Sequence, residues 1–188
     1  MKMIVKKKKA TGAIGYVVMF TLALMMVVLT LYLAQVARLM THQHHVDDSL
    51  ADSVLASLVA DDIYYFETYE MTGTPVIRFR SVDEAHDLFV DCMNAAIAET
   101  IGFYYNFAFD SYICYEVEES QVKITSYSGP GGNKSVSTGR VGNVRSPKGD
   151  IVRETSAYGR VKFDTKNIID GSFITKTKDI YCTLEINN

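Results

Sequence analysis

The sequence contains no tryptophan, only three prolines and three cysteines, and no charged residue between Gly12 and Ala34. Three cysteines cannot all pair within one chain, and their spacing matches no metal-binding pattern. The 12 tyrosines and nine phenylalanines argue against a disordered chain and are typical of a strand-rich packed domain. The 188 residues leave room for one membrane segment and one compact domain.

The motifs of common enzyme classes are also missing. The sequence has no Gly-x-Ser-x-Gly and no His-Glu-x-x-His, and no cysteine has a histidine partner that the sequence suggests. Asn133-Lys134-Ser135 is similar to the end of a phosphate-binding loop, but Ser128 and Asn133 stand where that loop needs glycines. We therefore predict that the protein is not an enzyme and has no catalytic residue, no cofactor and no nucleic-acid partner.

The three cysteines fall on predicted elements of secondary structure. Cys92 precedes Ala96 by one helical step, and Cys182 occupies the apolar face of an alternating strand, so both are predicted to be small core residues. Cys114 shares a strand face with Tyr112, opposite the more apolar alternate positions. Whether Cys114 and Cys182 form a disulfide stays open at this point.

The uncharged segment is the most informative feature of the chain. Its 23 residues span about 34 Å as a helix, which is enough to cross a bilayer. We predict a basic leader over residues 1–12 and a transmembrane helix over residues 13–37. Lys6–Lys9 flank one end and Arg38 alone flanks the other, so the N-terminus is predicted to be cytoplasmic and the C-terminal domain extracytoplasmic.

The helical pattern continues beyond the membrane segment. Val46, Leu50, Val54 and Leu58 recur at every fourth position, with Leu55 and Val59 beside them. We predict that the helix extends to about Asp62, that residues 38–63 are its extracytoplasmic continuation, and that the apolar stripe packs on the domain.

Residues 64–188 are predicted to form an α+β domain. Thr72-Gly73-Thr74-Pro75 indicates a turn, and Ser81 with Glu84 has the capping-box spacing of a helix that would run to Ile101 and end at Gly102. Short connections at Asp110-Ser111 and Glu118–Ser120 favour an antiparallel sheet of four to six strands. The predicted strands are Val76–Arg80, Phe103–Phe109, Tyr112–Val117, Gln121–Tyr127, Ile151–Phe163 and Ser172–Ile186.

Charge is unevenly distributed along this domain. Residues 47–119 contain sixteen acidic side chains but only Arg78 and Arg80, whereas residues 120–188 contain eleven basic and six acidic side chains. Two separately solvated faces explain this pattern, and so does mutual orientation of copies in an assembly. Ser128–Gly149, rich in Gly, Ser and Asn, is predicted to be a long exposed loop that is either functional or disordered.

Histidines and aspartates gather just after the membrane segment. A solvated polar collar, a pH-responsive collar and a metal site all fit their helical spacing, and the collar is the preferred interpretation because supporting ligands cannot be identified. No metal ligand is therefore assigned. His86 lies in a polar helix start and is predicted to be on the surface. The residues of the cluster are His42, His44, His45, Asp47 and Asp48.

The N-terminal segment from Lys6 to Tyr16, followed by the apolar helix, resembles the class III prepilins of type IV-like filaments, and most closely the TadE-type pseudopilins of tight-adherence (Tad) pili. The resemblance covers roughly residues 2 to 60. It implies that a prepilin peptidase cuts after Gly12 or Gly15, so that the mature chain begins at Ala13 or Tyr16. It also implies sister subunits as partners, together with the lipid bilayer.

The resemblance has one departure. Many members have a glutamate five residues into the mature chain, and that place holds Val17 or Phe20 here. A minor or initiating subunit, involved in assembly or surface adhesion, is therefore expected rather than a major one. The alternative is a monomeric signal-anchored extracytoplasmic protein that binds a ligand through residues 128–149.

Overall fold

Three helices and five strands make up the computed structural model, which describes residues 10–100, 104–129, 131–167 and 171–184. The helices are α1 (Ala10–Ser57), α2 (Asp62–Thr72) and α3 (Val82–Ala98). The strands are β1 (Tyr105–Glu118), β2 (Gln121–Ser128), β3 (Asn133–Arg140), β4 (Ser156–Lys166) and β5 (Phe173–Thr183). The chain divides into two units, Met1–Gln43 and His44–Asn188, so α1 contributes residues to both. Most of the predicted basic leader, including Lys2 and Lys6–Lys9, lies outside the described residues.

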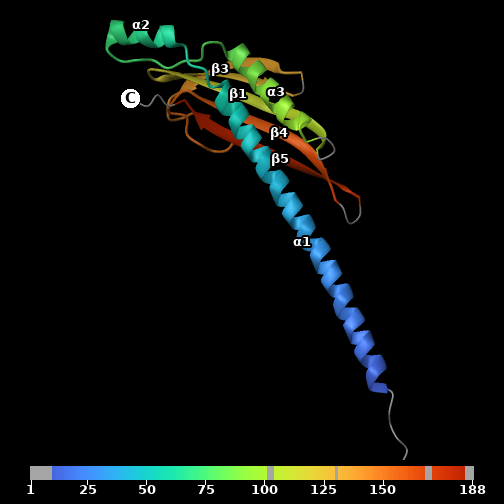
Figure 1. Ribbon diagram of the computed structural model, residues 1–188. Helices are drawn as coiled ribbons and strands as arrows, with labels where there is room; N and C mark the ends of the chain where they lie inside the picture. Colours follow the sequence, from blue (N-terminus) through green and yellow to red (C-terminus); the bar gives the residue numbers. More distant parts are fainter. Residues whose placement is uncertain (1–9, 101–103, 130, 168–170, 185–188) are drawn as a thin grey trace, which may run out of the picture. The chain divides into compact units, whose positions relative to one another are not determined.

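The second unit is built on one antiparallel sheet with the strand order β3-β2-β1-β4-β5. Figure 1 shows α3 and the last turns of α1 on the same face of this sheet. The predicted α+β class with an antiparallel sheet is confirmed. We call the side covered by α1 and α3 the helix face. Its core includes Val46, Leu50 and Val54 of α1, Phe89 of α3, and Tyr112 of β1.

The opposite face of the sheet has a core of its own. Tyr115, Val122 and Tyr158 point to this side, and Val152 packs against them with no exposed surface. Val152 lies in the connection between β3 and β4, where Val152 N donates to Val144 O at 3.0 Å. Both faces of the central strands are therefore covered, which explains why strict polar–apolar alternation is weak along β1.

The end of α1 differs from the prediction. The helix ends at Ser57 and not near Asp62, so only part of the predicted continuation over residues 38–63 is helical. Asp61 N donates to Arg78 O, and Arg80 N donates to Val59 O. These hydrogen bonds to residues 78–80 take the place of the bonds that a continued helix would make. Val76–Arg80 correspondingly forms an isolated bridge, Ala60 with Phe79, and is not a strand of the sheet.

Two further elements were predicted incompletely. Asp61 caps α2 by accepting from Tyr64 N, and Gly73 ends this helix with a φ of 69°, which an L side chain rarely adopts. The predicted turn after α2 is confirmed, but the helix itself was missed. The predicted cap of α3 is also confirmed, because the Ser81 side chain accepts from Glu84 N. The helical run ends at Ala98, and the predicted stop at Gly102 lies outside the described residues.

Two predictions about the sheet are wrong. Asp110-Ser111 is not a hairpin turn, because both residues lie inside one continuous strand, β1. The pairing register of β1 with β4 shifts between Tyr105 and Ala108 and again between Phe109 and Ser111, as at a β-bulge. Ser128–Gly149 is not an unstructured loop, because β3 pairs with β2 along its whole length, from Asn133 to Arg140. The connection at Glu118–Ser120 is a hairpin turn as predicted.

Candidate functional site

The N-terminal unit presents an apolar helix surface. The large apolar side chains from Ile14 to Leu33 are all more than half exposed. Thr21 donates its hydroxyl to Val17 O and Thr30 donates to Met26 O, each at 2.8 Å, so neither hydroxyl needs a partner outside the helix. In length and composition α1 can cross a membrane, because lipid would cover these side chains and every backbone group in this stretch has a helical partner.

The four candidate cleavage residues all lie in the first turns of α1. Tyr16 is 81% exposed, and a Cβ added to Gly12 or Gly15 would meet no atom within 4 Å. Glycine costs about 0.8 to 1.0 kcal/mol in a helix interior relative to alanine, so Gly12 and Gly15 lower the helix propensity of this end of α1. Ala13 belongs to the same turns. The structure therefore places Gly12, Ala13, Gly15 and Tyr16 together in the first turns of α1.

The C-terminal turns of α1 are locked into the domain. Val46 and Val54 have no exposed surface and Leu50 has 1%, so the predicted stripe packs on the sheet, with Leu58 partly buried beside it. Leu55 remains 53% exposed, however, and does not belong to the buried stripe. Burying each large apolar side chain contributes roughly 1.5 to 3 kcal/mol, so this contact is a main source of domain stability.

Polar atoms and one glycine fix the position of α1 on the sheet. Tyr112 donates its hydroxyl to Ser57 Oγ at 2.6 Å, and Ser57 Oγ donates to Val54 O. Burial raises the pKa of Tyr112 well above its usual value, so the phenol stays protonated and keeps donating. A Cβ added to Gly159 would lie 2.7 Å from Val54 Cγ2 and 3.0 Å from Phe89 Cε2, so glycine permits α1 and α3 to approach β4 closely.

The predicted histidine and aspartate cluster does not converge. Asp47 pairs with Lys178 of β5 at 2.7 Å, whereas His45 Nδ1 lies 3.5 Å from Ser49 Oγ. His44 and Asp48 are exposed. Across the described ranges, no group of three or more His, Cys, Asp or Glu side chains is arranged to hold a metal ion.

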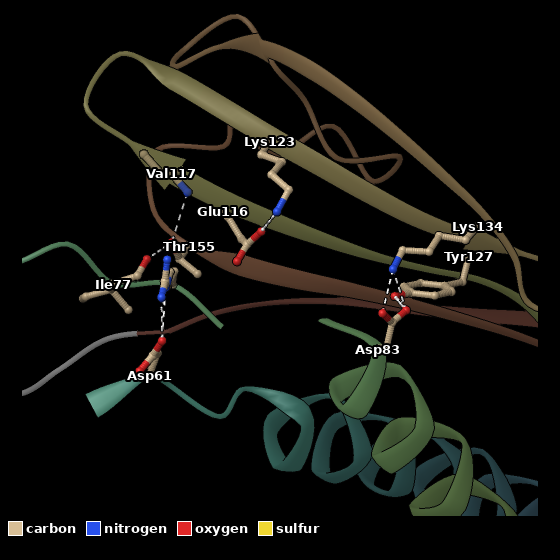
Figure 2. Close-up of polar contacts among 10 residues, drawn as sticks. Asp61, Ile77, Asp83, Glu116, Val117, Lys123, Tyr127, Lys134 and Thr155 are labelled. Carbon is tan, nitrogen blue, oxygen red and sulfur yellow. Dashed lines mark hydrogen bonds and ion pairs between the residues drawn. The ribbon is translucent and has the colours of Figure 1, made fainter. Parts of the chain in front are cut away.

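His86 was predicted to lie on the surface, but the structure places it half-buried in a polar cluster. Its ring stacks on Tyr127 with centroids 4.2 Å apart. Figure 2 shows Tyr127 and Lys134 converging on Asp83, with oxygen–oxygen and nitrogen–oxygen distances of 2.7 and 2.6 Å. Lys134 first and Tyr127 second lower the pKa of the Asp83 carboxyl. The cluster joins the start of α3 to β2 and β3. Sequence spacing could not indicate this contact, because Asp83 lies 44 residues from Tyr127 and 51 from Lys134 in the chain.

A groove of about 810 Å³ runs between α2 and the end of the sheet. Thr155 connects two segments that line the groove, because its hydroxyl donates to Ile77 O and accepts from Val117 N, as Figure 2 shows. At one side Tyr64 donates to Glu118 Oε1, and the Arg78 guanidinium lies 3.5 Å from the centre of the Tyr64 ring. Sequence analysis missed this groove, although Asp61 three residues before Tyr64 has the spacing of a helix cap.

Hydroxyl and charged side chains line the groove. They include threonine hydroxyls, Glu118, Glu119 and Arg153, and none of the lining residues is a histidine or cysteine. Cys114 lies elsewhere, fully buried on the helix face, where burial raises the pKa of its thiol to about 12. The thiol is therefore neutral and inert.

The three cysteines are all free. Cys114 pairs in register with Ala157, and Ala157 pairs with Cys182, so two strand spacings of about 4.8 Å each separate the cysteines. This is too far for a disulfide, which needs Cα atoms within about 7 Å. The prediction that Cys92 and Cys182 are core residues holds only in part, because both are half-buried and Cys114 is the fully buried one.

Comparison with protein-family models, with curated proteins and with solved structures found no match.

Proposed function

We propose that this chain is a structural or minor subunit, a pseudopilin, of a type IV-like or Tad filament or a related secretion filament. The observation that carries the proposal is the composition of α1. One helix of 48 residues supplies both an exposed apolar segment and the stripe that holds the sheet domain. A subunit that is extracted from a bilayer into a bundle of sister helices needs such a helix, because the apolar surface changes partners while the domain stays attached.

The maturation step follows from the same helix. A prepilin peptidase would hydrolyse the peptide bond after Gly12 or Gly15, adding water so that the leader ends in a carboxylate and the mature chain begins with a new amine at Ala13 or Tyr16. Each leader lysine costs about 2.5 to 3.5 kcal/mol at the bilayer centre, so five of them hold the helix at the cytoplasmic side until they are removed.

Val17 and Phe20 support a minor or initiating place for the subunit. Both are strongly exposed apolar side chains and stand at the two positions where a glutamate would otherwise pair with the amine of a neighbouring subunit. A subunit without this carboxylate gains no such ion pair when it joins a preformed bundle. Its place is therefore better suited to the start of an assembly than to repeated addition.

Mass spectrometry of the chain purified from its native membrane, in cells with an active prepilin peptidase, tests the proposal. We expect a mature N-terminus at Ala13 or Tyr16. Gly12→Leu and Gly15→Leu should separate the two positions, since only one of them should leave the leader attached. Gly131→Leu, at a domain position with open space around it, is the matched control. A chain that starts at Met1 or Lys2 in these cells would contradict the filament function.

The groove beside α2 favours a second candidate, a monomeric signal-anchored binding protein. Its hydroxyl and carboxylate lining suits a polar ligand, and such a protein needs no cleavage after Gly12 or Gly15. The same mass spectrum separates the two functions, because an intact N-terminus is expected only for the anchored binding protein.

A further inference from the structure

Carboxylates that have no basic partner lie on the outer side of the helices. Asp48 and Asp52 are one helical turn apart on α1, and Asp87 and Asp91 are one turn apart on α3; all four are exposed. Asp87 contacts His86, and within the described residues none of the four makes an ion pair with lysine or arginine. Ser53 Oγ lies 3.7 Å from Met93 Sδ, which shows that these parts of α1 and α3 are in contact. We call Asp48, Asp52, Asp87 and Asp91 the acidic helix face.

This arrangement does not stabilise the single chain. Like charges at positions i and i+4 destabilise a helix by a few tenths of a kcal/mol, and here two such pairs lie on neighbouring helices. The buried residues Leu50 and Phe89 on the other side of each helix already account for the packing on the sheet. The acidic helix face therefore contributes nothing to the packing of its own chain and is exposed to a partner of opposite charge.

A group of four basic side chains lies in the segment that carries Val144 and Val152, which pack on the other side of the sheet. Residues 140–153 contain Arg140, Arg145, Lys148 and Arg153 and only one acidic residue, Asp150. Their backbone forms a small hairpin in which Ser146 N donates to Asp150 O at 2.8 Å and Arg145 pairs with Ile151. We call residues 140–153 the basic hairpin.

The basic hairpin has an inner and an outer side. Val144 and Val152 pack against the second core, so the alternate positions Arg145 and Arg153 point outward and are exposed. Arg145 donates to Gly149 O at 3.0 Å and Asp150 accepts from Ser146 Oγ, so Asp150 does not pair with Arg145. The cations therefore face away from the sheet.

We propose that the basic hairpin of one copy docks on the acidic helix face of the next copy. An anionic polymer would explain the cations alone, and a cationic ligand would explain the carboxylates alone. A second copy of this chain satisfies both sets, since it presents the complementary charge to each. The two surfaces lie on opposite sides of one sheet, so they cannot meet within a chain, and their contact joins different surfaces of two copies, head to tail.

This contact deepens the proposed function by naming the domain surfaces through which neighbouring subunits meet, and it rests on that function for the parallel alignment of copies. Electrostatic complementarity fixes orientation and register more than affinity. The apolar helices would supply the attraction between subunits, and the domain charges would select which faces meet.

Zero-length carbodiimide cross-linking of the full chain in its native membrane tests the contact. This reagent joins a carboxylate to an amine as an amide with loss of water. Lys148 is the amine of the basic hairpin, and we expect cross-linked peptides between Lys148 and Asp48, Asp52, Asp87 or Asp91. Mixing isotopically labelled and unlabelled copies identifies links between chains. Raising the salt from about 0.1 M to about 1 M, which shortens the Debye length from about 10 to about 3 Å, should reduce their yield.

Charge reversal supplies the decisive comparison. Asp52→Lys/Asp91→Lys and Arg145→Glu/Arg153→Glu should each lower the yield of links to Lys148 by about tenfold, because like charges then face each other. Co-expression of the two double variants should restore the yield. Glu67→Lys/Glu70→Lys on α2 is the matched control, since both side chains are exposed and outside the two surfaces. Circular dichroism of each variant checks that the fold is retained.

The possible results separate the two hypotheses. Links that survive both reversals, or reversals that mixing does not restore in folded variants, would overturn the docking contact. Loss of surface adhesion on reversal of the hairpin alone, with no link to Lys148 in the wild type, would assign the hairpin to an anionic polymer instead. Cleavage after Gly12 or Gly15 without these links would support the filament function and overturn the docking contact. Links between chains that are not cleaved would support the docking contact and overturn the filament function.

Discussion

The two ends of α1 use apolar residues in different ways. From Ile14 to Leu33 the apolar side chains surround the helix and are exposed on all sides. Val46, Leu50, Val54 and Leu58 instead form one stripe that the domain covers, while Leu55 stays exposed. The same residue types are thus exposed around the whole helix in one part, as a helix that can cross a membrane requires, and packed in a protein core in the other. The angular distribution of apolar residues around the helix, and not their number, therefore decides which surroundings each segment of α1 requires.

A charge in the buried stripe should have the largest effect on the stability of the domain. Leu50→Asp should lower the free energy of unfolding of the domain by about 4 kcal/mol or more, because it buries an unpaired carboxylate and removes core volume. Leu55→Asp, on the exposed side of the same turns, should change it by no more than about 0.5 kcal/mol. Thermal unfolding of the full chain in lipid measures both, and equal effects would show that the stripe is not the packing surface.

A charge in the N-terminal part of α1 should affect membrane insertion and not the stability of the domain. Leu24→Arg should disfavour membrane insertion by about 3 kcal/mol while leaving the melting temperature of the domain unchanged. Leu24→Ala is the control that removes volume without adding charge. The fraction of chain that resists carbonate extraction measures insertion. A lower melting temperature of the domain with unchanged carbonate extraction would show that the segment around Leu24 packs on the domain and does not insert into the membrane.

Gly159 of β4 tests the same packing contact from the side of the sheet. Gly159→Ala should destabilise the domain by about 1 to 3 kcal/mol, because the new methyl group would lie within 3.0 Å of both Val54 and Phe89. Gly131→Ala, where nothing lies within 4 Å, is the matched control. Denaturant unfolding of both variants measures the difference. A neutral Gly159→Ala would mean that α1 and α3 do not sit as closely on β4 as described.

The smallest expected effect concerns the contact between α3 and the strands. Because Lys134 and Tyr127 lower the pKa of Asp83 in the folded protein, the stabilisation by this carboxylate is present above the unfolded pKa of about 3.9 and is lost as the pH falls through the lower folded pKa. Asp83→Asn should therefore cost less than about 1 kcal/mol at pH 7, because exposed ion pairs are screened. The difference from wild type should shrink below about pH 4. A difference that grows on acidification would contradict the sign of the pKa shift.

Sequence patterns predicted those elements whose signal is local. The stripe at Val46, Leu50 and Val54 repeats with the helical period, and the cap of α3 needs only Ser81 and Glu84. The stop of α1 at Ser57 was not predictable in this way, because it depends on bonds between Val59–Asp61 and Arg78–Arg80. Tertiary contacts overrode a helical pattern that continues in the sequence.

The strands show the same limit. Residues 133–140 have low strand propensity, yet β2 offers them a full ladder of backbone partners, so they form an edge strand. On β1 both Cys114 and its neighbour Tyr115 are buried, one on each covered face, so alternation could not indicate which face is the core. The groove at Tyr64 and the cluster at Asp83 likewise depend on contacts between distant segments.

Hydrogen exchange of the full chain in lipid nanodiscs tests the dual role of α1 most directly. We expect amides from Leu22 to Leu31 to be protected by the bilayer and amides from Val46 to Val54 by the domain. Denaturant that unfolds the domain should then remove protection from the second set and leave the first set protected. Loss of protection in both sets together, or rapid exchange from Leu22 to Leu31 before denaturant is added, would contradict the account.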